Sequence, residues 1–151
     1  KDIDNKDRKC YHLMLFKDAE LVAYCRLVPS GISYEGYASI GRVVSSSKYR
    51  KEGYGRHLMV KAMEKITQVF PHLPIKISAQ LYLQKFYESF GFTAVSEWYM
   101  EDEIPHIAMV NKLHHRWPRR TYLRTFRDID YPDIFSFSSV QIVFIPAYNF
   151  V

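Results

Sequence analysis

Two glycines separated by one residue stand out in the segment SSSKYRKEGYGRHLMVKAM, because cations flank them and an apolar, helix-like run follows. Gly53 and Gly55 have no side chains, so backbone N–H groups beside them can approach a ligand closely. The first N–H groups of the expected helix have no partners inside the helix and carry partial positive charge. Arg50, Lys51 and Arg56 add full charges, so the segment predicts a site for a phosphate group.

Two common phosphate motifs do not fit this segment. The GxxxxGK[ST] motif is absent, and the GxGxxG motif fails because Leu58 stands at the third glycine position. A nucleotide triphosphatase and a Rossmann oxidoreductase are therefore disfavoured. The alternative that remains open is that the two glycines only shape a tight entry into the helix.

Composition limits the class of protein. The chain has 151 residues, of which 48% are hydrophobic, and this is enough for one domain with one core. Its net charge of +5 favours anionic partners without requiring nucleic acid. Cys10 and Cys25 have no CxxC or zinc-ligand spacing, which predicts a reduced, cytoplasmic protein without a metal site. The first ten residues lack a signal-peptide core, and residues 140–151 are too short for a transmembrane helix.

Hydrophobic periodicity predicts an α/β or α+β sheet domain. Alternation and β-branched residues indicate strands at 11–16, 21–28 and 37–44, joined as an antiparallel meander. An amphipathic helix follows at 54–70, with its apolar positions three and four residues apart. The remaining elements are a strand at 75–79, a helix at 81–90 that ends at Gly91, and strands at 92–100 and 106–113.

Two motifs together resemble the general N-acetyltransferase (GNAT) superfamily. RKEGYG (50–55) is similar to its RxxGxG pattern, and YESFGF (87–92) is similar to the YxxxGF that closes its second motif. Over residues 2–113, the segments DIDNKD, ELVAYCRL, IGRVVSS, AQLYLQKFYESFGF and EDEIPHIAM resemble the ElaA-like branch in order and spacing. The resemblance implies the GNAT fold: a mixed, mostly antiparallel sheet, split in the middle, flanked by helices and holding acetyl-CoA in the split.

The resemblance also implies roles for individual residues. One strand would pair its backbone with the pantetheine arm of acetyl-CoA, the glycine loop would hold the pyrophosphate, and Gln80 stands where many members have Asn. Tyr87 would donate a hydrogen bond or a proton to the departing thiolate, and Arg26 and Arg42 are candidates for the acceptor pocket. The expected cofactor-binding residues are Val43, Val44, Ser45, Arg50, Lys51, Gly53, Tyr54, Gly55, Arg56 and Gln80.

Removing a proton from the acceptor amine is expected to be more difficult than protonating the departing thiolate. Presenting a lysine-like amine uncharged at pH 7 costs roughly 4.6 kcal/mol, because its pKa is near 10.4. The segment EDEIPH offers Glu101 and His106 as general bases, acting directly or through a water. A solvated acidic turn is the alternative interpretation of this segment. The expected function is transfer of an acetyl group from acetyl-CoA to a primary amine of a small molecule or peptide.

The chain departs from the family at both ends. The family normally has one more strand and two helices before DIDNKD, so residues 1–113 are expected to form a partial GNAT domain. Residues 114–151 form a basic and aromatic tail, in which SVQIVFIPAY is expected to pair with an exposed sheet edge. The open alternatives are a CoA-binding domain without transferase activity and a nucleic-acid-binding module that uses the tail, although nucleic acid is the less expected partner. A membrane partner is not expected, and a homodimer is compatible with the sequence.

Overall fold

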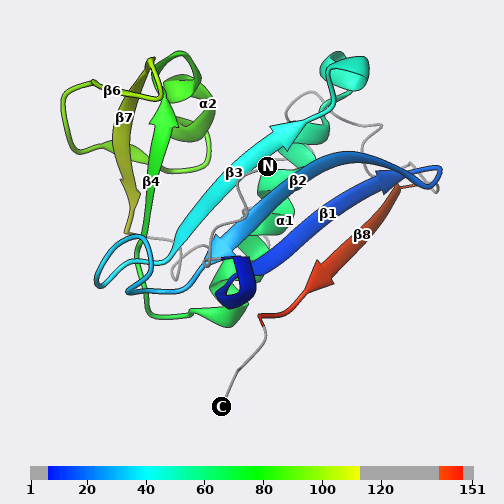
Figure 1. Cartoon of the computed structure of the whole chain (residues 1–151), viewed down its shortest axis with the longest axis horizontal. Coiled ribbons are helices and arrows are strands. Elements are labelled where there is room, and N and C mark those ends of the chain that lie inside the picture. The colour runs from blue at the N-terminus through cyan, green and yellow to red at the C-terminus, as the bar shows by residue number, and fades with distance from the viewer. Residues whose placement is uncertain (1–6, 113–139, 148–151) are drawn as a thin grey trace.

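The computed structural model describes residues 7–112 and 140–147 (Figure 1). The elements, in chain order, are η1 (Asp7–Lys9), β1 (Tyr11–Lys17), β2 (Glu20–Val28), β3 (Ser39–Ser45), η2 (Ser47–Glu52), α1 (Tyr54–Val69), β4 (Ile75–Gln80), η3 (Leu81–Leu83), α2 (Gln84–Glu88), β5 (Thr93–Ala94), β6 (Tyr99–Glu101), β7 (Ile104–Asn111) and β8 (Val140–Ile145). No helix in these described residues is long and apolar enough to cross a lipid bilayer.

The first three strands form the predicted antiparallel meander. β1 and β2 pair from Tyr11 with Leu27 to Lys17 with Glu20. Their two-residue turn consists of Asp18 and Ala19, which both have positive φ angles, as a type I′ hairpin turn requires. β3 then pairs with β2 and begins at Ser39, two residues later than the sequence suggested.

The strands form two four-stranded sheets that diverge from one point. One sheet has the order β3-β2-β1-β8, and in the other β7 pairs with β4, β5 and β6. Among the described residues, the two sheets meet at a parallel bridge between Ala38 and Ile75. Ala38 donates to the Pro74 carbonyl at 3.0 Å, and Lys76 donates to the Ala38 carbonyl at 2.9 Å. Figure 1 shows β3 and β4 separating beyond this bridge, so the predicted mixed, mostly antiparallel and split sheet is confirmed.

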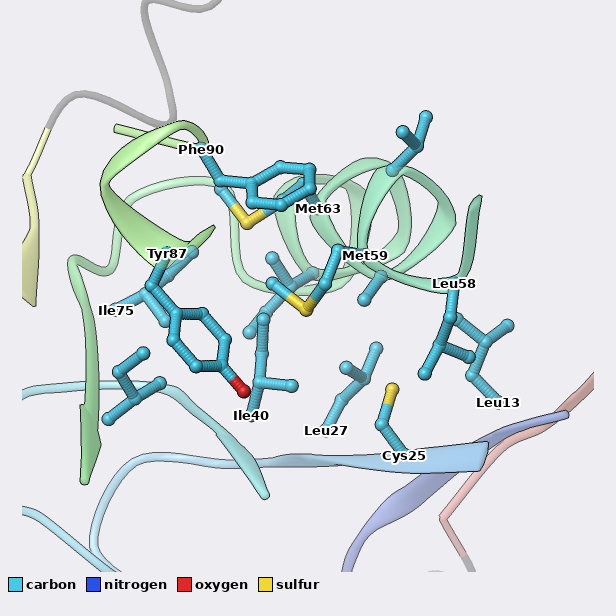
Figure 2. Close-up of a cluster of buried hydrophobic side chains, with 14 of the residues drawn as sticks. Leu13, Cys25, Leu27, Ile40, Leu58, Met59, Met63, Ile75, Tyr87 and Phe90 are labelled. Carbon is cyan, nitrogen blue, oxygen red and sulfur yellow. The ribbon is translucent and has the colours of Figure 1, made fainter. Parts of the chain in front are cut away.

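The main core lies between α1 and the first sheet. The apolar stripe of α1 includes Leu58, Met59 and Met63, which pack over β1 to β3 (Figure 2). Cys25 points into this core and has no exposed surface. Burial raises the pKa of its thiol to about 12, so the side chain stays protonated and packs as a small apolar group, as predicted.

The second helix is shorter than the predicted span of 81–90. Its first turn is the 3₁₀-helix η3, and the α-helix α2 comprises only Gln84–Glu88. Gln80, which precedes η3, makes no side-chain capping bond, and uncapped helix ends often tighten into 3₁₀ turns. The predicted stop is confirmed, because Gly91 has a φ of +91°.

The predicted strand at 92–100 is wrong in one respect, because it is broken into β5 and β6. Val95 donates to the Ala108 carbonyl at 2.9 Å, and the N–H of Ala108 donates to the hydroxyl of Ser96 at 3.1 Å. A side-chain acceptor thus replaces a backbone acceptor, which ends the regular ladder at this point. The acidic connection that follows is a two-residue turn of Asp102 and Glu103, both with positive φ angles.

The end of the tail joins the first sheet. β8 pairs antiparallel with β1 from Val140 with Lys17 to Ile145 with His12, so the predicted pairing with a sheet edge is confirmed. Phe144 stacks on Tyr11 with ring centroids 5.6 Å apart. The basic segment HHRWPRRTYLRTFR lies outside the described residues, and so does any nucleic-acid contact that it makes.

Candidate cofactor and acceptor site

A cleft of about 750 Å³ occupies the split between β3 and β4. Its walls combine the glycine loop, the free side of β3, the outer face of β4, and side chains from α2 and β6–β7. Most of the predicted site residues therefore converge on one cavity. These are Val43, Val44, Ser45, Gly53, Gly55, Arg56, Gln80, Tyr87, Glu101 and His106.

The two glycines of the loop differ in why a side chain is absent: Gly53 has a positive φ angle, whereas Gly55 does not. Gly53 joins η2 to α1 with a φ of +78°, a left-handed conformation that disfavours other residues. Gly55 has a helical conformation, and among the described residues a Cβ atom built on it would meet only the Ser45 hydroxyl oxygen, at 3.9 Å. The protein itself thus leaves room for a side chain at Gly55, which faces the cleft.

The start of α1 presents backbone donors to the cleft. The N–H of His57 makes the first i to i−4 bond, to the Gly53 carbonyl at 3.0 Å. Gly53 supplies no side-chain cap. The N–H groups of Gly55 and Arg56 precede this bond, in the first turn of α1. N–H groups in the first turn of a helix are available to bind an anion.

The rest of the loop is anchored to the β1–β2 turn. The Tyr49 hydroxyl donates to Glu20 Oε1 at 3.0 Å, and Lys17 Nζ lies 3.3 Å from Glu52 Oε1. These contacts hold η2, which carries Arg50 and Lys51, beside the cleft. The side chains of Arg50 and Lys51 lie outside the described parts of the structure.

The side chain of Tyr54 lies behind the glycine loop. Its side chain is 2% exposed, packs in the core and meets the Tyr49 ring edge to face at 5.7 Å. It does not line the cleft. The motif placed Tyr54 in the loop correctly, but its side chain stabilises the loop from behind, so only its backbone can contribute to ligand binding.

A bulge bends β3 beside the cleft. Tyr24 is paired with Val44 and Arg26 with Gly41, so Arg42 and Val43 together oppose Cys25. Arg42 has a φ of +52° and lines the cleft. Such bulges bend a strand and redirect side chains. Beyond the bulge Ser46 donates to the Val22 carbonyl at 2.8 Å, so by strand alternation the N–H of Ser45 points to the cleft side.

Tyr87 reaches the cleft from α2. It is 7% exposed, and its ring makes edge contacts with Phe86 and Phe92. Its hydroxyl points toward the first sheet, near Ile40 (Figure 2). Burial first, and then Cys25 and Tyr82, raise the pKa of Tyr87 to about 12. The phenol is thus a proton donor throughout the neutral pH range.

Arg56 connects the glycine loop to α2. Its Nη1 donates to the Ser89 hydroxyl at 3.1 Å, and its guanidinium lies over the Phe86 and Phe90 rings at 5.4 and 5.7 Å. These contacts fix a positive charge at the edge of the cleft, where the sequence predicted one.

Glu101 and His106 face each other on the second sheet. His106 Nδ1 lies 2.7 Å from the Ile104 carbonyl oxygen, which can only accept, so Nδ1 carries the hydrogen. In the neutral ring the lone pair is therefore on Nε2, 3.7 Å from Glu101 Oε2. Two acceptor atoms face one another, an arrangement suited to a bound ammonium or water. The alternative of a purely solvated acidic turn applies to Asp102 and Glu103, which do not line the cleft.

Ser78 and Tyr99 hold Glu101 in place. The Ser78 hydroxyl donates to Glu101 Oε1 at 3.1 Å, and the Tyr99 hydroxyl lies 2.6 Å from Ser78 Oγ. Since the single hydrogen of Ser78 is directed to Glu101, Tyr99 is the donor in the second bond. Tyr99 also stacks on His106 with ring centroids 6.3 Å apart. Within the described residues, no cluster of three or more His, Cys, Asp or Glu could hold a metal ion.

Known proteins are similar to this chain in fold and in sequence. Residues 2–113 match the family model for the acetyltransferase (GNAT) domain. The chain belongs to the GNAT acetyltransferase family. It is 44% identical to protein ElaA of Escherichia coli over 102 residues, which are 68% of this chain and 66% of ElaA.

Solved GNAT structures agree with this assignment. The crystal structure of E. coli ElaA has 43% identity and a TM-score of 0.67, over 73% of this chain and 74% of ElaA. An acyl-CoA N-acyltransferase from Pseudomonas aeruginosa has 45% identity and a TM-score of 0.62, over 66% of each chain. Aminoglycoside 6′-N-acetyltransferase, in complex with coenzyme A, shares the fold at 17% identity and a TM-score of 0.57, over 74% of this chain and 75% of that one.

The GNAT motifs did not reveal the whole site. Ser78 and Tyr99 were missed, although Ser78 stands between the buried residues Ile77 and Ala79 and so had to face the opposite side of its strand. Only the pairing of β6 with β7, which sets Tyr99 against His106, brings these side chains together.

Proposed function

We propose that this GNAT protein transfers the acetyl group of acetyl-CoA to a primary amine, with both substrates bound in the cleft between β3 and β4. The observation that carries the proposal is Gly55. The fold has room for a side chain there, and Gly55 lies beside backbone donors that face the cleft. A glycine that packing does not require indicates close approach of a ligand to the backbone.

The residues of the cleft fit coenzyme A in three parts. The N–H groups of Gly55 and Arg56, with the charge of Arg56, would bind the pyrophosphate. The backbone of β3 would pair with the pantetheine arm through groups such as the N–H of Ser45. Gln80 lines the opposite wall and would donate to the same arm.

The chemistry needs one proton acceptor and one proton donor. The amine nitrogen forms a bond to the thioester carbonyl carbon, and the carbon–sulfur bond breaks. The proton lost by the amine passes to His106 Nε2 or Glu101 Oε2, directly or through a water. The Tyr87 hydroxyl donates a hydrogen bond or its proton to the departing sulfur, and its raised pKa keeps that proton available.

Calorimetric titration of the folded protein with coenzyme A tests the cofactor site. We expect saturable binding with one molecule per chain, and a folded sample that binds no coenzyme A would contradict the proposal. Release of free thiol from acetyl-CoA in the presence of primary amines then tests transfer. Binding without thiol release across such a panel would indicate a CoA-binding domain without transferase activity.

Other features of the proposal concern the setting of the enzyme. We propose a cytoplasmic location, for which the support is that Cys10 and Cys25 are both buried thiols rather than a disulfide. The division into a GNAT domain at 1–113 and a tail at 114–151, and a homodimeric state, are likewise proposals. Limited proteolysis and analytical ultracentrifugation test these two.

A further inference from the structure

The residues that line the cleft differ strongly in exposure, and this difference locates its closed end. Val44 and Tyr82 are exposed and stand at the mouth of the cleft. Ile40, Ile77 and Tyr87 line the same cleft, but they are only 5%, 2% and 7% exposed. These three side chains therefore form the floor of the cleft, and the floor is apolar except for the hydroxyl of Tyr87.

The floor lies on the helix side of the split. Consecutive residues of a strand point to opposite faces of the sheet, so Ile77 and Ser78 of β4 face different ways. Ser78 faces the side of Glu101, to which its hydroxyl donates. Ile77 faces the other side and belongs to the same core cluster as Tyr87 of α2. The groups proposed to accept the amine proton are thus on one side of the split, and the floor is on the other.

The floor also lies next to the group proposed to assist the departing thiolate. The Tyr87 hydroxyl points toward the first sheet, near Ile40 (Figure 2). In the proposed reaction this hydroxyl donates to the thioester sulfur, so the sulfur would lie beside Ile40. The acyl carbon is bonded to that sulfur, so the acyl chain would begin at the floor and have apolar side chains on its helix side.

The surrounding core holds the two isoleucines of the floor in place. Ile40 and Ile77 each stand two residues beyond the bridge between Ala38 and Ile75, on opposite strands. Ala38 and Ile75 have no exposed surface, and all four residues belong to one core cluster. Because protein cores are close-packed, additional methylene groups force side chains out of their preferred positions. The floor therefore limits the length of chain that can be bound against it.

We propose that Ile40 and Ile77 select the acyl group of the thioester and limit it to the two carbons of acetyl. This inference rests on the proposed function and specifies its acyl substrate. A longer acyl chain would press against this pair and displace packed side chains. Valine at either position shortens the side chain by one carbon and should make room for propionyl, and alanine should make room for butyryl.

Calorimetric titrations with coenzyme A, acetyl-CoA, propionyl-CoA and butyryl-CoA test this proposal without an acceptor amine. For each variant, the Kd of every thioester is divided by the Kd of coenzyme A, so that changes common to all four ligands cancel. The variants are Ile77→Val, Ile40→Val and Ile77→Ala. Ile66→Val is the matched control, because Ile66 of α1 is buried in the same core but does not line the cleft.

We expect the wild type to bind acetyl-CoA about as tightly as coenzyme A, and butyryl-CoA about 10- to 100-fold more weakly, as overfilling a packed site predicts. Both valine variants should lower the Kd ratio for propionyl-CoA, and Ile77→Ala should lower it for butyryl-CoA. Ile66→Val should leave every ratio unchanged. The valine variants remove a single carbon each, so they decide the question even if Ile77→Ala does not fold.

Three results would overturn the proposed acyl selection. These are equal Kd values of the wild type for all three thioesters, the same ratios in the wild type and in both valine variants, and an equal change of the ratios in Ile66→Val. In each case the cofactor site stands, because the Kd of coenzyme A itself is measured separately. A folded sample that binds no coenzyme A contradicts the proposed function itself.

Discussion

Replacing Gly55 by alanine separates the needs of the fold from the needs of a ligand. The new Cβ would lie 3.9 Å from the Ser45 hydroxyl oxygen, an ordinary contact distance. Alanine in a helix is more favourable than glycine by about 0.5–1 kcal/mol, so the free energy of unfolding should stay equal or rise by up to that amount. For a chain of this size, this corresponds to a Tm increase of about 1–4 °C.

The same substitution should weaken coenzyme A binding. The added methyl group faces the cleft and would hold a phosphate away from the N–H groups of Gly55 and Arg56. Losing one hydrogen bond to a charged group costs about 1.5–3 kcal/mol, which is roughly a 10- to 100-fold increase in Kd.

Calorimetry can measure both effects on one sample. At a coenzyme A concentration of 100 times the wild-type Kd, the wild type gains about 2.7 kcal/mol of stability from the ligand. A variant with a 100-fold higher Kd gains only about 0.4 kcal/mol under the same conditions. Gly53→Ala is the matched control, because its φ of +78° makes alanine unfavourable by about 1–2 kcal/mol and should lower the Tm without ligand.

Gly55→Ala is expected to keep or raise the Tm, whereas Gly53→Ala is expected to lower it. If Gly55→Ala binds coenzyme A with the wild-type Kd, the N–H groups beside it do not hold the pyrophosphate. If Gly55→Ala lowers the Tm as much as Gly53→Ala does, the glycine serves the helix entry, and the alternative interpretation of the motif is correct.

Four other perturbations test the rest of the molecule. Tyr87→Phe should lower kcat by up to about tenfold and leave the Kd for coenzyme A unchanged, because a thiolate leaves readily without full protonation; an unchanged kcat removes Tyr87 from the reaction. Because the pKa of Tyr87 in the folded protein is raised to about 12, the stability that its protonated form contributes below pH 10 should fall between pH 10 and 12. Unfolding curves of the wild type and of Tyr87→Phe at alkaline pH measure this loss. Glu101→Gln should lower kcat about 100-fold, and Ser78→Ala should lower it less, with recovery in Ser78→Thr; equal rates in all three variants contradict the hydrogen-bonded base. Burial is the main cause and the charge of Lys61 the second cause that lower the pKa of His57 to about 4. The stability that neutral His57 provides above pH 6.5 should therefore be lost as the pH falls toward 4. In denaturant titrations, the free energy of unfolding of a His57→Asn variant should depend less on pH in this range, and an unchanged pH dependence would assign the effect to other groups.

Local patterns in the sequence were sufficient for much of the fold. The β1–β2 hairpin and α1 are set by alternation and helical periodicity, and both appear within two residues of their expected positions. The break at Ser96 could not be predicted, because it depends on a bond from the N–H of Ala108, twelve residues away. The bulge at Arg42 likewise depends on its pairing with β2, which no local propensity specifies.

In the candidate site, too, some residues could be predicted from local sequence patterns and others could not. The glycine loop could be predicted from the sequence, because a site formed by backbone groups requires glycines, and their spacing can be read directly. Glu101 and His106 were named only from their chemistry, whereas Ser78 and Tyr99 carried no local signal. Their roles arise from the register of β4, β6 and β7, which sets Ser78 opposite Ala108 and Tyr99 opposite His106.

The bridge between Ala38 and Ile75 has a consequence for how the cleft can be observed. Its two hydrogen bonds lie at the vertex where the half-sheets meet, so any change in the angle between β3 and β4 must strain or break them first. The amide protons of Ala38 and Lys76 are therefore native reporters of that angle. Their rates of exchange with deuterated solvent should be lower with coenzyme A than without it if the ligand holds the two sheets at a fixed angle.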